Sequence, residues 1–459
     1  MPEFLHRSRL DHPAAEVFAW HARPGAFERL MPPWIDARVL ERTGGLQDGA
    51  RLVFEIRRGP LRQKWVAVHR GYIEGREFTD VQLRGPFAHW EHTHRFEAVD
   101  ETSCLTEDLV HYQLPGGRVG RLLGDGVVRR ELVRMFTLRH DRTRLDLARH
   151  ARFGDRPRQR IAVTGASGLI GRSLCAFLTT GGHEVVRVVR RAPRAGEIGW
   201  DPSAGRLDAN ALEGIDAIVH LAGESIASGR WTEKKKREIQ ESRVAGTRLI
   251  ARALTKLVRP PRTWICASAI GYYGDRGDEI VTEESGPGTE FVSTSCVAWE
   301  AETEPAAQAG IRVAKLRTGI VLSAAGGALQ KMLVPFGAGL GAIFGTGEQA
   351  MSWIAHEDVI GATHHILFTE ALAGPINLTA PTPVPQREFA RLLGEVLRRP
   401  VWARAPAPIV ELLFGEMGRS LLLGGARVAP TKLLAHGFEF AFPDLETTMR
   451  SELGLLEEE

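Results

Sequence analysis

Three glycines with regular spacing stand at the head of one helical segment. Gly165, Gly168 and Gly171 directly follow the apolar run 160–164. A second apolar run, 184–189, arrives at the distance typical of a strand–helix–strand unit. Glycines in such a turn let the backbone approach a pyrophosphate, which is then held by the free N–H groups of the helix N-terminus. The segment therefore predicts a dinucleotide-binding turn, and a purely structural glycine-rich turn is the alternative.

The end of the second apolar run bears on the choice of cofactor. In NAD-selective proteins a carboxylate about 20 positions past the glycines binds the ribose 2′-hydroxyl. Here Arg190 and Arg191 stand at that spacing. A guanidinium offers paired donors that match a 2′-phosphate. We therefore predict NADP(H) as the cofactor, with Arg190 as the main contact and Arg191 as the second, against the alternative of two solvent-exposed arginines.

A histidine cluster lies in the first third of the chain. His89, His92 and His94 fall within one alternating segment, and His92 and His94 share a strand face because side chains alternate along a strand. Histidines on one face are candidate metal ligands. No cysteine accompanies them and no fourth ligand is defined, so we predict ordinary strand polarity and no metal site.

Composition excludes several classes of protein. The 59 Lys and Arg against 56 Asp and Glu give a net charge of only +3, which argues against a dedicated nucleic-acid binder. The four cysteines are widely spaced and form no C-x-x-C pair, so neither a disulfide scaffold nor a zinc ribbon is expected. The N-terminus lacks a signal-peptide core, and no apolar run could span a membrane. We predict a soluble, cytoplasmic protein, and its oligomeric state stays open.

The elements that must position these residues divide at a polar seam over 150–160. Before it, a strand, a helix, several alternating strands and a long helix at about 129–150 predict an α+β domain. After it, strands alternate with helices, which predicts a parallel, doubly wound sheet with its ligand at the strand C-termini. We expect domains at 1–153, 160–385 and 386–459, the last a small C-terminal lobe.

Several motifs after the seam occur in a recognisable order. They are Thr164–Gly171 (TGASGLIG), His220–Gly223 (HLAG), Ser268–Gly274 (SAIGYYG), Arg317–Leu322 (RTGIVL) and Trp353–Asp358 (WIAHED). Together they resemble the extended, atypical short-chain dehydrogenase/reductases called epimerase family proteins. The tail, with Phe414–Glu416, Gly424–Arg427, Pro430, Lys432 and Gly437–Phe440, is similar to that group's C-terminal domain of unknown function. The resemblance covers about residues 160–452 and implies a Rossmann-type fold.

The resemblance also implies which residues contact the cofactor. The glycines with Ser167, Leu169 and Ile170 match the pyrophosphate turn, and Leu221 and Ala222 match the loop beside the cofactor ribose. On the helix expected over about 232–257, which also carries Glu238, Arg243 matches a polar residue that reaches the cofactor. Val321 matches the loop that flanks the nicotinamide. We take all of these as candidate cofactor-binding residues.

The catalytic pair typical of that superfamily is missing. Its members carry Tyr-x-x-x-Lys, in which the lysine lowers the tyrosine pKa so that the phenol exchanges a proton with the substrate. None of the four tyrosines has a lysine four positions later, and Cys296 and Glu300 stand where the pair should fall. We predict Ser268, at a strand end, as a hydrogen-bond donor to a substrate carbonyl, and Tyr273 as a source of a phenol. A strand-end cap is the alternative for Ser268. We expect Cys296 to be a buried apolar residue, with a thiol acid as the alternative, and Glu300 to be a helix-surface carboxylate.

The first 150 residues resemble a second family. Their order of strand, helix, many strands and long helix, together with the segment 15–34, is similar to the helix-grip, START-like (SRPBCC, cyclase/dehydrase) proteins. In such a domain the sheet curls round the last helix and leaves an apolar cavity, so the resemblance implies a hydrophobic ligand. A packed domain that only modulates its neighbour is the alternative.

Taken together, these features predict an NADP-dependent oxidoreductase or epimerase acting on a small carbonyl or hydroxyl compound. A non-catalytic NADP-binding module that senses the cofactor or docks a partner, with the first domain as a carrier, is the second hypothesis. A lipid-binding protein whose nucleotide fold is only structural is the third. We expect no nucleic-acid partner and no membrane span.

Overall fold

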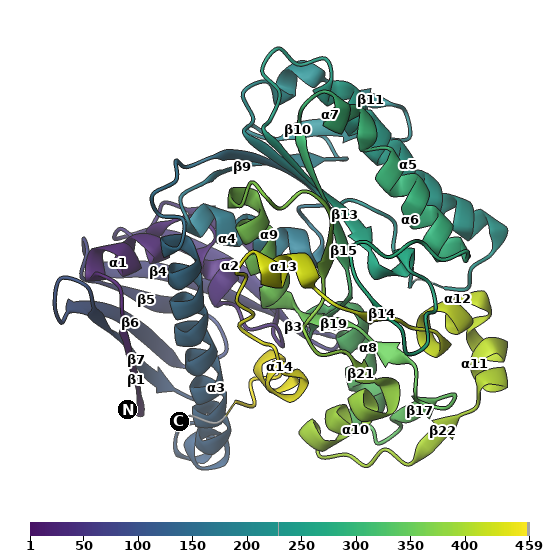
Figure 1. Ribbon diagram of the computed structural model, residues 1–459. Coiled ribbons are helices and arrows are strands. Elements are labelled where there is room, and N and C mark those ends of the chain that lie inside the picture. Colours follow the sequence, from purple (N-terminus) through teal and green to yellow (C-terminus); the bar gives the residue numbers. More distant parts are fainter. Residues whose placement is uncertain (228, 457–459) are drawn as a thin grey trace. The chain divides into compact units, whose positions relative to one another are not determined.

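The structure is a computed structural model that describes residues 1–227 and 229–456 (Figure 1). The chain folds into two compact units. The first holds Met1–Asp155 with Thr179–Gly182 and the segment that begins at Ser451, and the second holds Arg156–Leu178 and His183–Arg450. Each unit has a main sheet and hydrophobic clusters of its own.

The first unit is an antiparallel sheet that packs against a long helix. The strands lie in the order β1-β7-β6-β5-β4-β3-β2. They are β1 (Glu3–Leu10), β2 (Asp36–Thr43), β3 (Arg51–Arg58), β4 (Leu61–Ile73), β5 (Glu77–Arg84), β6 (His89–Ala98) and β7 (Cys104–Gln113). The helices are α1 (Ala14–Ala22), α2 (Ala26–Leu30) and α3 (Gly117–Ala151). Figure 1 shows α3 running alongside this sheet.

Alternation along the strands decides which side chains face α3. Strand β7 alternates buried and half-buried residues along its length, as expected for a strand with one face in a core. Its inward residues Val110 and Tyr112 pack with Trp90 of β6 and with Phe136 of α3. A second cluster beside them includes Val17, Phe18 and Trp20 of α1 with Leu147 of α3. A sheet gripping its last helix is the predicted helix-grip arrangement.

Two elements of this unit differ from the sequence prediction. Strand β2 (Asp36–Thr43) was not foreseen, because it is an edge strand that is exposed over much of its length and carries little apolar alternation. Helix α3 begins at Gly117 rather than near residue 129. Four glycines in its first ten residues hide the start, since glycine disfavours a helix by about 1 kcal/mol relative to alanine.

The second unit is built on a mostly parallel sheet. Its strand order is β11-β10-β9-β8-β12-β13-β15-β20, and only β11 pairs antiparallel. The strands are β8 (Arg160–Thr164), β9 (Glu184–Val189), β10 (Ile198–Asp201), β11 (Arg206–Leu207), β12 (Ala217–His220), β13 (Thr263–Ala269), β15 (Arg312–Thr318) and β20 (Gly374–Leu378). The order reverses beside β8, which has β9 on one side and β12 on the other. At such a switch point, ligands bind outside the strand C-termini.

Helices cover both faces of this sheet. One core cluster joins Val163 of β8 to α4 (Leu169–Thr180) and α9 (His356–Phe368). The other joins the neighbouring Ala162 to α5 (Glu233–Leu254), α6 (Phe291–Ala301) and α7 (Glu304–Gln308). Because consecutive residues of one strand enter opposite clusters, the sheet is buried on both sides, which explains its continuous apolar runs.

Short elements complete the second unit. The strand pairs are β14 (Ile280–Val281) with β23 (Arg427–Val428), β16 (Ile320–Ser323) with β19 (Trp353–Ala355), β17 (Ala342–Phe344) with β22 (Ala403–Ala405), and β18 (Ala350–Met351) with β21 (Val384–Pro385). The helices are α8 (Gly327–Gly337), α10 (Gln386–Val396), α11 (Ala407–Phe414), α12 (Glu416–Gly418) and α13 (Thr431–Ala435). Helix α14 (Leu445–Glu452) begins in this unit, and its last two residues belong to the segment assigned to the first unit. Short η1 (Ala209–Leu212), η2 (Ile270–Tyr272) and η3 (Arg419–Leu423) accompany them.

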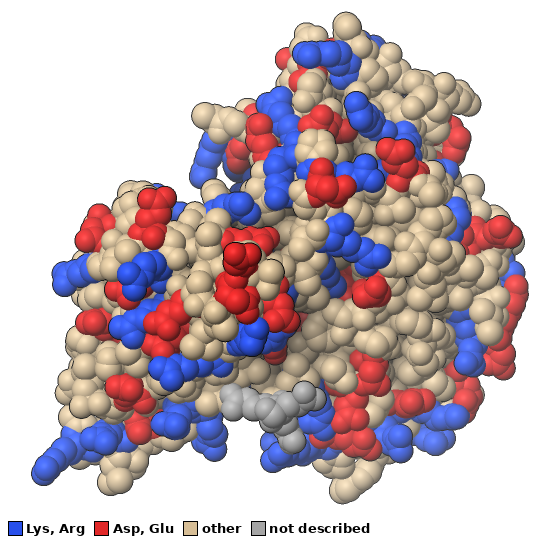
Figure 2. Space-filling view, turned by 60° about the vertical axis from the view of Figure 1, so that its left-hand side comes forward, with Lys and Arg blue, Asp and Glu red and all other residues tan. Residues whose placement is uncertain are grey.

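The predicted fold class is therefore confirmed: a Rossmann-type parallel sheet follows an α+β helix-grip unit. In the part of the chain that the structure describes, every helix is too short or too polar to cross a membrane. Figure 2 shows Lys and Arg side chains interspersed with Asp and Glu over the face in view, in keeping with the small net charge.

The domain boundary leads to a test by truncation. We expect the fragments 1–153 and 158–459 to fold separately, because each contains a main sheet with its own buried clusters. Each fragment should show a cooperative transition in urea, followed by circular dichroism. Aggregation of both fragments, under conditions in which the whole chain stays monodisperse, would show that the boundary is misplaced.

Candidate active site

The glycine-rich turn joins β8 to α4 at the switch point of the sheet. Gly165 adopts φ +67°, and a Cβ there would lie 2.8 Å from the backbone carbon of Leu221. A Cβ on Gly171 would overlap the carbonyl oxygen of Gly165. Both positions therefore require glycine. Gly168 is exposed at the start of α4, where the helix presents free N–H groups. This cradle fits a pyrophosphate.

Thr164 ties this turn to the next strand. Its Oγ1 accepts hydrogen bonds from the backbone N–H groups of Leu221 at 3.1 Å and Ala222 at 3.2 Å. Its own proton therefore goes to Nδ1 of His220, 2.7 Å away. Burial lowers the pKa of His220 to about 3, so the ring is neutral and can accept that proton. Sequence reasoning missed Thr164, which holds two of the predicted cofactor-binding residues against the glycine turn.

Apolar residues line the other side of the turn. Ile170, Leu221 and Val321 are each partly buried and pack against the same core cluster. A Cβ built on Gly326 would lie 3.3 Å from the Leu169 side chain, which places Leu169 beside the loop after β16. Ser167 is exposed on the turn.

The two predicted phosphate-binding arginines have different surroundings. Both are exposed just after β9. Arg191 donates to Glu197 at 2.5 Å, and this ion pair lowers the pKa of the Glu197 carboxyl to about 2. Arg190 lies close enough to Glu224 to help lower the pKa of that carboxyl, whose direct partner is Lys235 at 2.6 Å. Arg190 is thus the arginine better placed to receive an anion, in line with its predicted rank.

Helix α5 carries the two remaining cofactor candidates. Arg243 donates to the carbonyl of Ile239 at 2.9 Å and lies over the Trp299 ring, and a Cβ on Gly223 would be 3.7 Å from its side chain. Burial lowers the pKa of Arg243. Glu238 is exposed one turn earlier and pairs with Lys235 at 3.8 Å. Arg243 therefore lies beside the β12 loop, whereas Glu238 faces solvent.

The substrate side contains a closed ion pair. Glu300 on α6 receives two hydrogen bonds of 2.9 Å from the Arg317 guanidinium, and Ser268 donates to the same carboxylate at 2.7 Å. The two side chains of the pair are only 8% and 4% exposed. The expected helix-surface position of Glu300 is wrong, because its partner Arg317 comes from the interior strand β15. Since a serine hydroxyl has one proton, Ser268 in this arrangement cannot also donate to a substrate carbonyl.

The phenol of Tyr273 is part of the same network. The Tyr273 side chain is fully buried, donates to Asn377 at 2.7 Å and accepts from Arg317 at 3.1 Å. Both capacities of the hydroxyl are therefore used inside the protein, which corrects the expectation that this phenol is open to a substrate. The neighbouring Tyr272 is partly exposed.

Cys296 occupies the position of the missing tyrosine. It is 4% exposed, and burial together with the nearby Glu300 charge raises the pKa of its thiol to about 12. Its cluster includes Trp231 and Val292, with Tyr272 packed against it. These contacts favour the apolar role for Cys296.

The strand order and the glycine cradle define an NAD(P)-binding, Rossmann-type protein. Family models agree: residues 161–377 match the NAD dependent epimerase/dehydratase family, and residues 405–452 match a domain of unknown function (DUF1731). Residues 10–136 match polyketide cyclase / dehydrase and lipid transport proteins, a START-like family.

Individual relatives give the same result. Epimerase family protein Mb2239 of Mycobacterium bovis is 42% identical over 281 residues, which are 61% of this chain and 93% of the relative. The chain therefore belongs to the epimerase family proteins. A nucleoside-diphosphate sugar epimerase from Corynebacterium glutamicum superposes with a TM-score of 0.82 at 34% identity, over 98% of this chain and 90% of that one. Human epimerase family protein SDR39U1 with NADPH gives 0.58 at 33% identity, over 64% of this chain and 99% of that one.

The buried ion pair generates a stability prediction. Glu300→Ala should lower the free energy of unfolding by about 3–5 kcal/mol, because it leaves the buried Arg317 charge without its carboxylate. The matched control is Glu302→Ala, two residues further on, where the pair with Arg248 is 21% and 46% exposed. That control should cost at most about 1 kcal/mol. Urea unfolding measures both, and equal losses would contradict the structural role of the Glu300–Arg317 pair.

Proposed function

We propose that the protein binds NADP(H) and transfers a hydride between its nicotinamide and a small carbonyl or hydroxyl compound, as an oxidoreductase or epimerase. The observation that carries the cofactor choice is the exposed Arg190 after β9, where NAD-selective proteins have a carboxylate. The human relative solved with NADPH supports the same choice. The free N–H groups of α4 and the required glycines at 165 and 171 fit the pyrophosphate of such a cofactor.

In this proposal each candidate residue has a defined task. The turn from Gly165 to Gly171, with Ser167 at its exposed tip, holds the pyrophosphate, and Arg190 binds the 2′-phosphate with Arg191 as a weaker second contact. Leu221 and Ala222 lie against the ribose, and Arg243 approaches from α5. Val321 flanks the nicotinamide. We assign Glu238 to the solvent-exposed edge of the same cofactor site.

The cofactor assignment is tested at Arg190. Arg190→Ala should weaken NADPH binding by about 1.5–3 kcal/mol, the range for a hydrogen bond to a charged group, and leave NADH binding almost unchanged. Arg191→Ala is the matched control and should have a smaller effect, because Arg191 is already paired with Glu197. Titration of each variant with both cofactors, followed by fluorescence, gives the comparison. Equal losses for NADPH and NADH would remove the 2′-phosphate role of Arg190.

Reduction of a carbonyl requires a proton as well as a hydride, and Tyr272 is the phenol best placed to supply it. It is partly exposed, and no hydrogen bond to its hydroxyl is seen within residues 1–227 and 229–456. Its ring packs against the cluster that contains Cys296, the residue that the family resemblance aligns with the superfamily's catalytic tyrosine. We therefore move the proposed proton donor from Tyr273 to Tyr272. Ser268 then positions Glu300 and does not bind the substrate.

Two single substitutions separate these phenols. Tyr272→Phe should lower kcat by about 10²–10⁴-fold, the usual contribution of a general acid, without changing NADPH affinity. Tyr273→Phe should retain activity and lose about 1–3 kcal/mol of stability, because Asn377 and Arg317 lose a buried partner. NADPH oxidation would be followed with aldehydes and ketones. Epimerisation consumes no net cofactor, so with sugar nucleotides, which the Corynebacterium relative suggests, formation of the epimer would be followed instead. The reverse pattern would exclude Tyr272 as the donor.

The closed Ser268–Glu300–Arg317 network favours a second candidate function. It fills the position of the usual catalytic pair with groups that already satisfy one another. Such a protein could bind NADP(H) tightly and act as a cofactor sensor or docking module without turnover. If the wild type binds NADPH tightly but converts no compound in the substrate panel, the result would support this second function over the first.

A further inference from the structure

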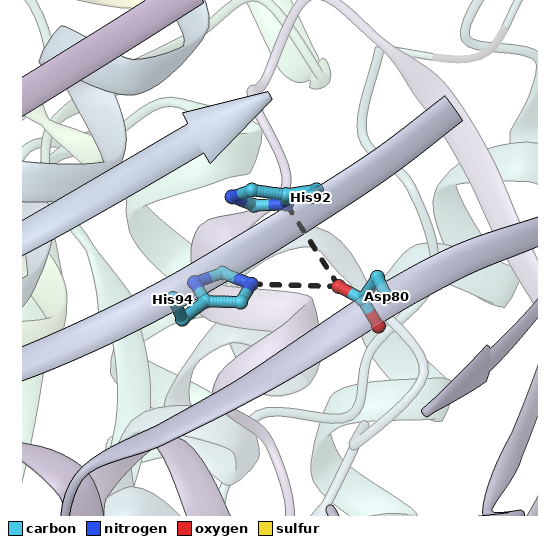
Figure 3. A group of neighbouring side chains, drawn as sticks. All are labelled: Asp80, His92 and His94. Atoms are coloured by element: carbon cyan, nitrogen blue, oxygen red, sulfur yellow. Dashed lines mark hydrogen bonds and ion pairs between the residues drawn. The ribbon is translucent and has the colours of Figure 1, made fainter. Parts of the chain in front are cut away.

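The inward face of the first unit's sheet carries an unexpected group of polar side chains. His92 and His94 of β6 and Asp80 of β5 lie on this face, and all are buried or half-buried. Figure 3 shows the two imidazole rings turned toward one oxygen of Asp80. A pocket beside them is lined by His21, His94, Asp108, Arg139 and His140 among others, so it differs from the apolar cavity that the START-like resemblance implies.

The distances within this group match those between the ligands of a metal site. Oδ2 of Asp80 lies 3.4 Å from Nε2 of His94 and 3.8 Å from Nδ1 of His92. A charged hydrogen bond would bring such atoms to about 2.7–2.9 Å. Ligands about 2.1 Å from a tetrahedral zinc ion are instead about 3.4 Å apart. One ligand atom from each of the three residues lies within 4.8 Å of the others, which leaves room for an ion between them.

In each ring, the nitrogen that faces away from Asp80 contacts a carboxylate, as the non-ligating nitrogen of a metal-bound histidine usually does. Nε2 of His92 and Nδ1 of His94 each lie 2.7 Å from Oδ1 of Asp108. Because a carboxylate only accepts, both nitrogens carry protons. The nitrogens that an ion would use, Nδ1 of His92 and Nε2 of His94, therefore face Asp80. Against the effect of burial, the Asp108 carboxylate raises the pKa of His94 to about 9, so an ion bound at neutral pH would displace a proton from Nε2 of His94. Carboxylate–histidine–metal chains of this kind fix the ring orientation in known zinc sites.

The surrounding groups hold the two carboxylates in place. The second oxygen of Asp80 is 2.8 Å from Nε2 of His69. The second oxygen of Asp108 is 2.5 Å from Nε2 of His140, whose Nδ1 meets the Ser8 hydroxyl at 2.6 Å. Each ligand thus has a fixed neighbour before any ion arrives.

From these contacts we propose that Asp80, His92 and His94 form a divalent transition-metal site, with zinc as the best fit, inside the helix-grip unit. The mixed nitrogen and oxygen ligands suit zinc and its neighbours in the periodic table better than magnesium or calcium. Three protein ligands leave one position for water. His94 also lines the adjacent pocket, whose volume of about 10 Å³ suits a single water molecule, so water is the fourth ligand that fits there.

The proposal is tested on the whole chain, purified without a histidine tag. After treatment with a chelator, the protein should bind one Zn²⁺ per chain in a competition titration with a chromophoric chelator. Co²⁺ should give the intense visible absorption of a four-coordinate site. Asp80→Asn and His94→Gln should each weaken Zn²⁺ binding at least 100-fold. Asp108→Asn, which changes only the group that orients the ligands, should weaken it about 10–100-fold.

The matched control is His89→Gln, a histidine on the same strand whose side chain is 38% exposed and is not part of the group. It should leave Zn²⁺ affinity unchanged, and circular dichroism should show every variant folded. If wild type binds no stoichiometric Zn²⁺ and gives no Co²⁺ spectrum, or if His89→Gln loses as much affinity as His94→Gln, the group is a metal-free network of buried ion pairs and the proposal is overturned. The Co²⁺ spectrum of wild type decides this even if a variant fails to fold.

Discussion

The close approach of two backbones at the C-terminal end of β8 is the constraint on which the rest of the second unit depends. Gly165 leaves no side chain between the turn and the β12 loop, and Thr164 fastens that loop through two backbone N–H groups. A larger residue at Gly165 or Gly171 would separate the strands at the switch point. Because the Gly165 turn and the β12 loop lie this close together, the N-terminus of α4 and the β12 loop can face Val321.

The two sides of the active site follow different physical rules. The cofactor side relies on backbone geometry, which tolerates change at exposed positions such as Ser167. The substrate side relies on charged and polar groups buried together, where the change of one residue leaves its partners unsatisfied. Arg317 makes this plain, because it pairs with Glu300, donates to the Tyr273 hydroxyl and lies over the Tyr272 ring at once. The usual Tyr–Lys pair could not be restored by replacing Cys296 and Glu300 alone, since Arg317 would then lack its carboxylate.

What could be predicted from the sequence follows the same division. The glycine turn and the parallel, doubly wound sheet depend on local spacing, and the sequence contains that spacing. The partners of Tyr273 and Ser268 lie 104 and 32 residues away, so no local pattern could show that these hydroxyls are occupied. Glu300 was misread for the same reason: a carboxylate on a helix looks solvent-exposed until its arginine is known. In the first unit, the pair of His92 and His94 was visible, but Asp80 and Asp108 came from other strands.

The inward-facing aspartates and histidines of the first unit also affect how the strands of that sheet pair. Asp80 lies directly across from His92, and Asp108 directly across from His94, in the pairing of β6 with its two neighbours. A slip of β6 by one residue would turn both histidines outward and present Glu91 and Arg95 to the interior. In a slip one way Glu91 would oppose Asp80, and in a slip the other way Thr93 would, so neither slipped form keeps a histidine opposite Asp80 or Asp108. The loss of both carboxylate–imidazole pairs disfavours these forms, so the pairs select one alignment of strands that apolar side chains alone would distinguish less sharply.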